Sequence, residues 1–224
     1  MARILLIETS TAKLSVALSE DGRIVSERSC EEARQQASLT APFVKEVLDA
    51  QGWKVSDCDA VCIGKGPGSY TGLRVGVSTA KGLAFGAGKA LLSVGTLDIL
   101  AQEAVGFEGV IVPMIDARRM EVYTAVFSSE GEQLTPVEAK VIDAESFSEY
   151  LETGPILFIG DGALKCQGVL THPNAHFKES WPSAAYMAQL AEKKFQAGQF
   201  EDIAYFEPFY LKDFVATVSR KNLF

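Results

Sequence analysis

The most distinctive chemical feature of this sequence is a glycine-rich segment, Gly64-Lys65-Gly66-Pro67-Gly68-Ser69-Tyr70-Thr71-Gly72-Leu73-Arg74-Val75-Gly76. It follows a short apolar run and precedes a helical pattern, so it is predicted to connect a strand to a helix. Glycines allow close approach of the backbone, and the first amides of a helix form an anion site. The segment is not a Walker loop, because Lys65 precedes the helix. A tight turn whose glycines serve only packing is the alternative.

Other residue types that carry out catalysis are present without the neighbours they need. His172 and His176 have the i, i+4 spacing of metal ligands on a helix. The proline and asparagine between them, however, predict a loop. Ser69 lies in no GxSxG motif and has no motif-linked base. The sequence therefore predicts no catalytic residue and no metal site in this chain.

Charged residues also gather at a predicted hairpin in the second half of the chain. Asp116 ends an apolar run, and Arg118 and Glu121 follow it closely. These three side chains either contact a ligand between the halves or stabilise the turn, and both interpretations stay open.

The charge balance excludes one class of partner and indicates another. The chain has 224 residues, with 21 basic and 29 acidic side chains and a net charge of −8. A surface that binds nucleic acid through phosphates needs clustered Lys and Arg, so the isolated chain is expected to bind tRNA weakly. Residues 60–97 nevertheless contain no Asp or Glu but include Lys65, Arg74, Lys81 and Lys89. This positive stretch is expected to face an anion or another protein surface.

The hydrophobic pattern predicts the elements that position these residues, in two successive βββαβα halves. The first half spans Ile4–Ile7, Leu14–Ser19, Arg23–Glu27, the helix Gln36–Gln51, Ala60–Ile63 and the helix Tyr70–Gly86. The second spans Val110–Asp116, Glu121–Ser128, Leu134–Ile142, the helix Ala144–Glu152, Ile156–Ile159 and the helix Ser183–Ala197. We predict an α/β protein with halves at residues 1–98 and 99–224, each a mixed β-sheet with flanking helices. The last helix and tail are candidates to pack back on the first half.

Small residues line one side of the second predicted helix. Positions 72, 76, 80, 84 and 88 are Gly, Gly, Ala, Ala and Gly. A glycine inside a helix costs up to about 1 kcal/mol relative to alanine, so a compensating close contact is expected. Either the chain's own sheet or a helix of another subunit would supply it.

Four motifs together resemble one known family. The segment Gly64–Gly76 looks like the hallmark of the TsaB (YeaZ) family of tRNA threonylcarbamoyladenosine biosynthesis. Similar matches are Ile7–Ser10, Ile115–Arg118 with Glu121–Tyr123, and Glu207–Lys212, in the family's order and spacing. The chain is identified as a member of that family.

The resemblance implies a fold and a candidate nucleotide site. The family belongs to the actin-like ATPase superfamily, in which two ribonuclease-H-like halves enclose a nucleotide. The first strand usually ends in Asp-Thr, whereas this chain has Glu8-Thr9, which weakens the expectation of nucleotide chemistry here. Residues implied to contact a nucleotide or phosphate are Glu8, Thr9, Ser10, Gly66, Gly68 and Ser69.

The resemblance also implies partners. It implies a non-catalytic subunit and activator of the larger TsaD, which holds the metal and transfers threonylcarbamoyl to the adenosine beside the tRNA anticodon. TsaE joins the complex, tRNA binds only through the complex, and the chain alone forms a homodimer. No cofactor is required by this chain, and ATP or ADP would lodge at the partner interface. The implied partner and dimer interface consists of Leu39, Phe43, Val47, Tyr70, Gly72, Leu73, Gly76 and Ala80.

Two other classes of function stay open at this point. One is an enzyme, either an actin-like ATPase or an M22-type glycoprotease-like metalloenzyme, and the other is a self-associating structural protein. The four cysteines form no CxxC pair and fit buried thiols in a reducing compartment. With no apolar stretch of membrane-spanning length and no signal peptide, the expected location is the cytoplasm, away from any membrane.

Overall fold

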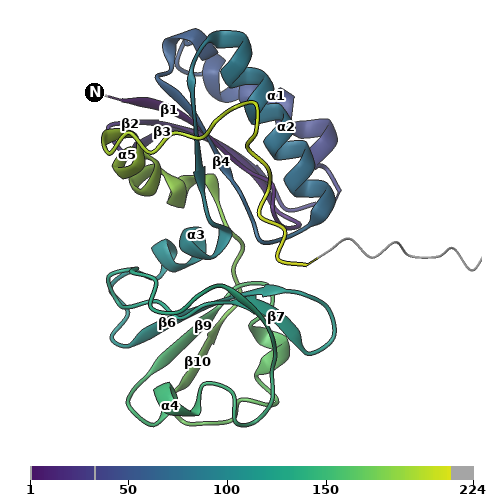
Figure 1. Cartoon of the computed structure of the whole chain (residues 1–224), viewed down its shortest axis with the longest axis vertical. Coiled ribbons are helices and arrows are strands. Elements are labelled where there is room, and N and C mark those ends of the chain that lie inside the picture. Colours follow the sequence, from purple (N-terminus) through teal and green to yellow (C-terminus); the bar gives the residue numbers. More distant parts are fainter. Residues whose placement is uncertain (1, 33, 213–224) are drawn as a thin grey trace, which may run out of the picture.

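Two five-stranded β-sheets form the framework of the molecule, one in each half (Figure 1). The computed structural model describes residues 2–32 and 34–212. The strand order is β3-β2-β1-β4-β5 in the first sheet and β10-β9-β6-β7-β8 in the second. Read from the opposite edge, the second order repeats the first, with β6 in the place of β1 and β9 in the place of β4. Both halves therefore share one topology.

The first sheet is mixed. Its central strand β1 pairs antiparallel with β2 and parallel with β4, and β4 pairs parallel with β5. The strands are β1 (Arg3–Glu8), β2 (Leu14–Glu20), β3 (Arg23–Cys30), β4 (Ala60–Gly64) and β5 (Ala90–Val94). The helices of this region are α1 (Gln36–Asp49), the 3-10 turn η1 (Val55–Asp57), α2 (Tyr70–Ala87) and α3 (Thr96–Glu103).

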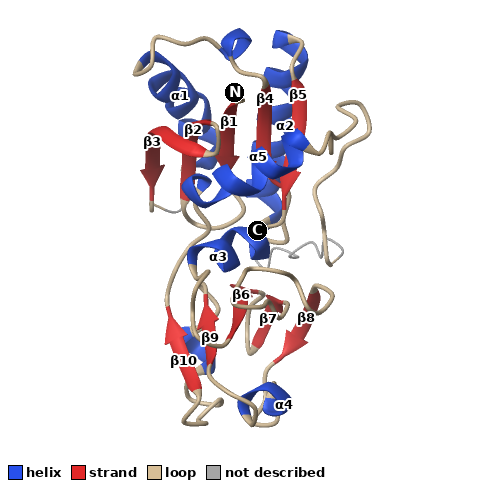
Figure 2. Ribbon diagram, turned by 90° about the vertical axis from the view of Figure 1, so that its left-hand side faces the viewer, coloured by secondary structure: helices blue, strands red, loops and turns tan. Residues whose placement is uncertain are grey.

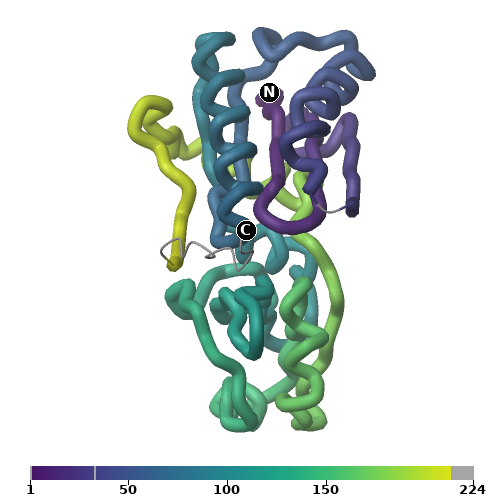
Figure 3. Tube along the Cα trace, turned by 90° about the vertical axis from the view of Figure 1, so that its right-hand side faces the viewer, coloured from purple at the N-terminus to yellow at the C-terminus, as the bar shows by residue number. Residues whose placement is uncertain are grey.

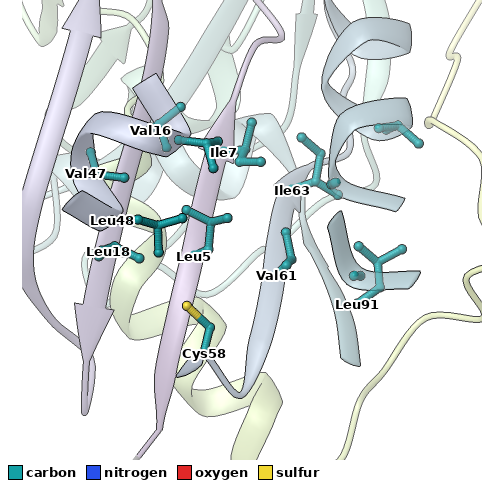
Figure 4. Close-up of a cluster of buried hydrophobic side chains, with 14 of the residues drawn as sticks. Leu5, Ile7, Val16, Leu18, Val47, Leu48, Cys58, Val61, Ile63 and Leu91 are labelled. Carbon is teal, nitrogen blue, oxygen red and sulfur yellow. The ribbon is translucent and has the colours of Figure 1, made fainter. Parts of the chain in front are cut away.

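Helices cover both faces of the first sheet, and this explains why β1 and β4 are continuously apolar. Leu5 and Ile7 point to the core under α1 and α2 (Figure 4). Ile4 and Leu6, one residue out of phase, point to the core under the last helix. That helix, α5 (Ala188–Gln196), follows the second sheet in the chain but packs on the first (Figure 2).

The second sheet is smaller and less covered. Its strands are β6 (Val110–Asp116), β7 (Glu121–Thr124), β8 (Glu138–Val141), β9 (Ile156–Ile159) and β10 (Ala175–Lys178). Helix α3 packs on it, and the short elements α4 (Ser148–Leu151) and the 3-10 turn η2 (Leu164–Cys166) flank it. The 3-10 turn η3 (Ala184–Met187) packs on the first sheet. The edge strand β10 alternates between half-buried and exposed residues, as strands with one solvated face do, and the edge strand β8 has no buried residue.

The predicted α/β fold with two mixed sheets is confirmed. The sequence pattern missed β5, α3 and β10, and it made the third strand of the second half too long, since β8 covers only Glu138–Val141. Part of the second predicted half, residues 213–224, lies outside the described residues. Within residues 2–32 and 34–212, no helix is both long and apolar enough to cross a membrane.

Candidate functional site

The glycine-rich segment connects β4 to α2, as predicted. Ser69 is the N-cap of α2, and its hydroxyl accepts a hydrogen bond from the amide of Gly72 at 3.3 Å. The amide of Ser69 in turn donates to the carbonyl of Ser10 at 2.6 Å. The segment is thus joined to the turn that follows β1. Ser10 and Ser69, about sixty positions apart in the sequence, meet there because β1 and β4 are parallel neighbours.

Glu8, at the end of β1, is sealed inside this junction. Its side chain is fully buried, and Oε1 accepts a hydrogen bond from the amide of Ser10 at 2.5 Å. Its other oxygen, Oε2, lies over the backbone of Gly64, where an added Cβ would come closer than 3.0 Å. Burial raises the pKa of the Glu8 carboxyl, against the lowering effect of the Ser10 hydrogen bonds. The acid therefore packs against β4 instead of facing an open cleft.

The glycines of α2 close on the same turn. An added Cβ at Gly72 would overlap the carbonyl oxygen of Thr9, and one at Gly76 would lie 2.9 Å from Cδ1 of Ile63. The hydroxyl of Thr9 donates to the carbonyl of Gly72 at 2.8 Å. The small-residue side of the helix thus packs on the chain's own sheet, which is one of the two alternatives that the sequence left open.

This geometry corrects the placement of several proposed interface residues. The five that lie buried within the chain are Val47, Gly72, Leu73, Gly76 and Ala80. Val47 and Ala80 belong to the core under α1 and α2, Gly72 and Gly76 lie on the turn after β1, and Leu73 lies against Gly66. These residues therefore have no free surface for another subunit in this structure. The other three, Leu39, Phe43 and Tyr70, are half-buried at the margin of α1 and α2. Whether the two helices bind a partner stays a prediction.

The outward face of α2 carries residues that the sequence reasoning missed. Phe85 is 79% exposed. Added Cβ atoms at Gly82 and Gly86 would meet nothing within 4 Å, so these two helical glycines have no compensating contact within the chain. Gly82 lies on a different side of the helical wheel from Gly72 and Gly76, and this signal could have identified it, whereas Gly86 lies close to Gly72 on the wheel and gave no such signal. Figure 3 shows α1 and α2 side by side at this face.

The candidate nucleotide residues do come together, but mostly in packed positions. Glu8, Thr9 and Ser10 are fully buried, and an added Cβ at Gly68 would overlap Ser10. Only Ser69 is exposed. The site of a nucleotide therefore stays a prediction.

In the second half, the charged hairpin forms a more open polar corner. The carboxylate of Asp116 pairs with Lys165 and accepts a hydrogen bond from the amide of Arg118 at 2.9 Å. The ammonium group of Lys165 also donates to the carbonyl of Glu121 at 2.6 Å. Oδ1 of Asp161 accepts from the amide of Asp116 at 2.9 Å, and burial raises the pKa of the Asp161 carboxyl. These contacts favour the turn-stabilising interpretation.

The two histidines are on a loop and a strand, not on a helix. His172 precedes β10 and accepts a hydrogen bond at Nδ1 from the amide of Asn174, at 3.2 Å. His176 lies in β10 and contacts the ring of Phe107, with ring centroids 6.0 Å apart. The described part of the chain brings together no group of three or more His, Cys, Asp or Glu side chains suited to a metal ion.

The C-terminal segment, residues 201–212, lies along α2 and reaches the second half (Figure 1). The ammonium group of Lys81 donates to the carbonyl of Phe206 at 2.9 Å, and the amide of Phe209 donates to the carbonyl of Lys65 at 2.8 Å. The rings of Tyr210 and Tyr70 lie 4.8 Å apart. This segment therefore covers one side of the glycine-rich connection.

With this geometry in view, comparison with known proteins identifies the family. A family model described as TsaD, tRNA N6-adenosine threonylcarbamoyltransferase, matches residues 30–219. The tRNA threonylcarbamoyladenosine biosynthesis protein TsaB of Escherichia coli is 31% identical over 226 residues, which is 96% of this chain and 96% of that protein. The chain belongs to the TsaB family. The resemblance inferred from the four motifs is confirmed.

Solved structures agree with this assignment. The TsaB-family structure titled YeaZ from Pseudomonas aeruginosa is 29% identical and has a TM-score of 0.81, covering 94% of this chain and 100% of that one. An activator of 2-hydroxyisocaproyl-CoA dehydratase from Clostridium difficile, solved with bound ADPNP, has a TM-score of 0.52 at 8% identity. It covers 88% of this chain and 97% of that chain, and at this identity it shows the fold alone. The actin-like ATPase fold is thereby confirmed.

Proposed function

We propose that this chain is the non-catalytic subunit and activator of TsaD in the complex, with TsaE, that attaches threonylcarbamoyl to tRNA. The observation that carries this proposal is the full-length match to TsaB of Escherichia coli, a tRNA threonylcarbamoyladenosine biosynthesis protein. The structure adds a candidate contact surface, which we call the α1–α2 face. It consists of the outward residues Ala41, Pro42, Lys45, Thr71, Arg74, Ser78, Gly82, Phe85 and Gly86.

The composition of the α1–α2 face supports a protein partner. An aromatic side chain that is mostly exposed, such as Phe85, is a typical anchor in protein interfaces. Gly82 and Gly86 leave the helix backbone open, so a partner helix can approach closely. Arg74 gives the face a positive charge, which favours an acidic group on the partner, whereas the charge of Lys45 is paired with Asp49.

The surroundings of Glu8 support a non-catalytic role. A carboxylate that positions a metal ion or a water molecule needs a free oxygen facing the ligand. In this chain Oε1 accepts a hydrogen bond from Ser10, and Oε2 has no hydrogen-bond partner among the described residues but is buried against Gly64. The group would therefore have to leave its packed position to reach a ligand. Any ATP or ADP would instead depend on surfaces that the partner completes.

The proposal has three further parts, which concern tRNA binding, the homodimer and the location of the complex. With a net charge of −8, the chain alone binds tRNA weakly, and the basic surface comes from the partner. A homodimer through the α1–α2 face would use the same patch twice and would compete with TsaD. We expect the complex to act in the cytoplasm, where tRNA is modified.

Reconstitution with TsaD, TsaE, tRNA and threonylcarbamoyl-adenylate tests this function. Phe85→Asp is expected to weaken binding to TsaD at least about tenfold, as loss of an interface anchor does, with a matching loss of modified adenosine. The control is Val141→Asp, because Val141 is 66% exposed but lies on the edge strand β8 of the second half. Normal assembly of the Phe85 variant, or an equal defect in the control, would remove the α1–α2 face from the proposal.

The enzyme alternative is tested on the isolated chain. We expect neither ATP turnover nor peptide cleavage above background. ATP hydrolysis that disappears in Glu8→Gln, or peptide cleavage that disappears in His172→Ala, would overturn the non-catalytic role.

A further inference from the structure

A cavity of about 590 Å³ lies between the two halves, on the β5 side of the glycine-rich connection. Residues 65–67, 94, 95, 97 and 98 of the first half form part of its wall, and α5 forms another part. The loop between β7 and β8 closes it from the second half with Glu132 and Gln133, and Phe209 of the C-terminal segment completes it. Of the candidate nucleotide residues only Gly66 lines this cavity, whereas Glu8, Thr9 and Ser10 lie outside its wall.

Three lysines line the cavity: Lys65, Lys193 and Lys194. None of them lies within 4.0 Å of a carboxylate oxygen, as far as the described residues extend. The ammonium group of Lys194 donates to the carbonyl of Ser93 at 2.7 Å, which fixes its position but leaves its charge in place. Ammonium groups without an ion pair can receive an anionic ligand.

Two carboxyl groups share the cavity with these lysines, and they do not cancel them. Asp98 is turned onto the start of its own helix, since an added Cβ at Gly95 would come closer than 3.0 Å to Oδ2 of Asp98. Burial raises the pKa of Asp98, although Lys194 and Lys65 oppose that rise. Glu132 lies on the loop of the second half. The lining therefore keeps an excess of positive charge.

Much of the remaining wall is apolar, although Gln133 and Gln199 also line it. Val94, Leu97, Leu190 and Phe209 lie in the wall beside the ammonium groups. Pockets that hold small organic ligands have this composition, with a mostly hydrophobic lining and a few polar groups that fix orientation. A purely inorganic anion would leave the apolar wall unused, and a neutral ring would leave the lysines without a counter-ion.

We propose that this cavity binds a small organic anion, with its phosphate or carboxylate on the lysines and an apolar ring against Leu97 and Phe209. Both halves and the C-terminal segment contribute to the wall, so the bound anion holds them together. This site is independent of the α1–α2 face and of the proposed work with TsaD.

Calorimetric titration of the full chain with small probes tests the proposal. Phenyl phosphate carries both features of the ligand, benzoate changes the head group, inorganic phosphate lacks the ring, and phenol lacks the charge. For a ligand of this size we expect one saturable site with a dissociation constant of about 1 mM or below for phenyl phosphate or benzoate. Phosphate and phenol should each bind at least about tenfold more weakly.

Variants locate the binding. Lys65→Gln combined with Lys193→Gln should weaken phenyl phosphate binding at least about tenfold, because two charge-assisted contacts are lost. Ala197→Trp should fill the cavity from α5, where Ala197 is exposed at the wall, and abolish binding. Lys45→Gln, on α1 and outside the cavity, should bind like the wild type. Circular dichroism confirms that each variant is folded.

Three outcomes would overturn the proposal. They are no saturable binding of either ring-bearing anion to the wild type, equal binding by the lysine double variant, and loss of binding in Lys45→Gln. If Ala197→Trp unfolds the chain, the lysine double variant still decides the question, since both side chains lie at least partly in solvent.

Discussion

The first strand of each half ends on an acidic residue, but the two carboxyl groups have opposite surroundings. Glu8 is fully buried, with one oxygen against the backbone of Gly64. The side chain of Asp116 is 45% exposed and pairs with Lys165. The strand topology of the two halves is the same, so topology places the acid at the strand end and its neighbours decide its state.

The surroundings of Glu8 and Asp116 differ because different elements follow β4 and β9. In the first half, an eighteen-residue helix follows β4 and covers the end of β1 through Gly72 and Gly76. In the second half, β9 is followed only by the three-residue turn Leu164–Cys166, and the corner around Asp116 stays accessible. The end of the first strand is therefore packed against a helix in the first half, whereas in the second half it stays polar and accessible.

The substitution Gly72→Val should have the largest effect, and it tests whether α2 packs on the turn after β1. The added side chain would overlap the carbonyl oxygen of Thr9, which is backbone and cannot move aside. We expect destabilisation of about 3 kcal/mol or more in urea unfolding, at the upper end for overpacking. The control is Gly82→Ala, where nothing lies within 4 Å and stability should rise by up to about 1 kcal/mol. Similar stability of both variants would mean that α2 does not close on the turn after β1.

Glu8→Gln sharpens the comparison through pH. Burial raises the pKa of Glu8 above its ordinary value of 4.5, so the folded state binds this proton more tightly than the unfolded chain. The stability that the protonated acid contributes is complete below pH 4.5 and is lost as the pH rises through the raised value. The variant should therefore match the wild type in acid and become the more stable of the two at neutral pH. Urea unfolding across this range measures the difference, and parallel curves would contradict a buried acid.

Lys165→Met tests the open corner. The substitution removes the pair with Asp116 and the hydrogen bond to the carbonyl of Glu121. Because the pair is partly exposed, we expect a loss of about 1 kcal/mol in thermal or urea unfolding. Lys140→Met, whose partner Glu138 is on the same edge strand, should change stability by less than about 0.5 kcal/mol. A loss at Lys165 as large as that at Gly72 would remove the contrast between the halves.

Lys212→Ala gives the smallest expected effect. Lys212 pairs with Glu121 and so ties the C-terminal segment to the second half. Exposed ion pairs contribute about 0–1 kcal/mol, and the loss should shrink further as salt is added. Thermal unfolding at two salt concentrations measures it, and a salt-independent loss would argue against an electrostatic origin.

The strands of the first half could be predicted well from the sequence. A strand buried on one face alternates between apolar and polar residues, and a strand buried on both faces is continuously apolar. The sequence placed the strand-to-helix connection of Gly64–Gly76 correctly for the same reason. It did not predict α3 or β10, since these elements owe their stability to tertiary contacts more than to a repeating pattern. The orientation of the small residues in α2 was undetermined, because a smooth helix side fits an internal sheet and an external helix equally well.

The cavity could not be predicted from the sequence, for a different reason. Lys65 is separated from Lys193 and Lys194 by more than half the chain, and it meets them only because α5 returns to the first sheet. Among the exposed glycines of α2, Gly82 carried a signal in its position on the helical wheel, whereas Gly86 did not.

The return of α5 to the first sheet has a consequence for synthesis on the ribosome. Ala184, Met187 and Ala191 complete the core that lies under Ile4 and Leu6. The first strand emerges early, but the residues that cover one of its faces emerge only near the end of translation. The N-terminal half therefore cannot mature as a finished domain while the rest is being made, although domains commonly fold in that order. We expect nascent chains that end before Ala184 to keep an apolar sheet face uncovered, a surface on which a chaperone would act.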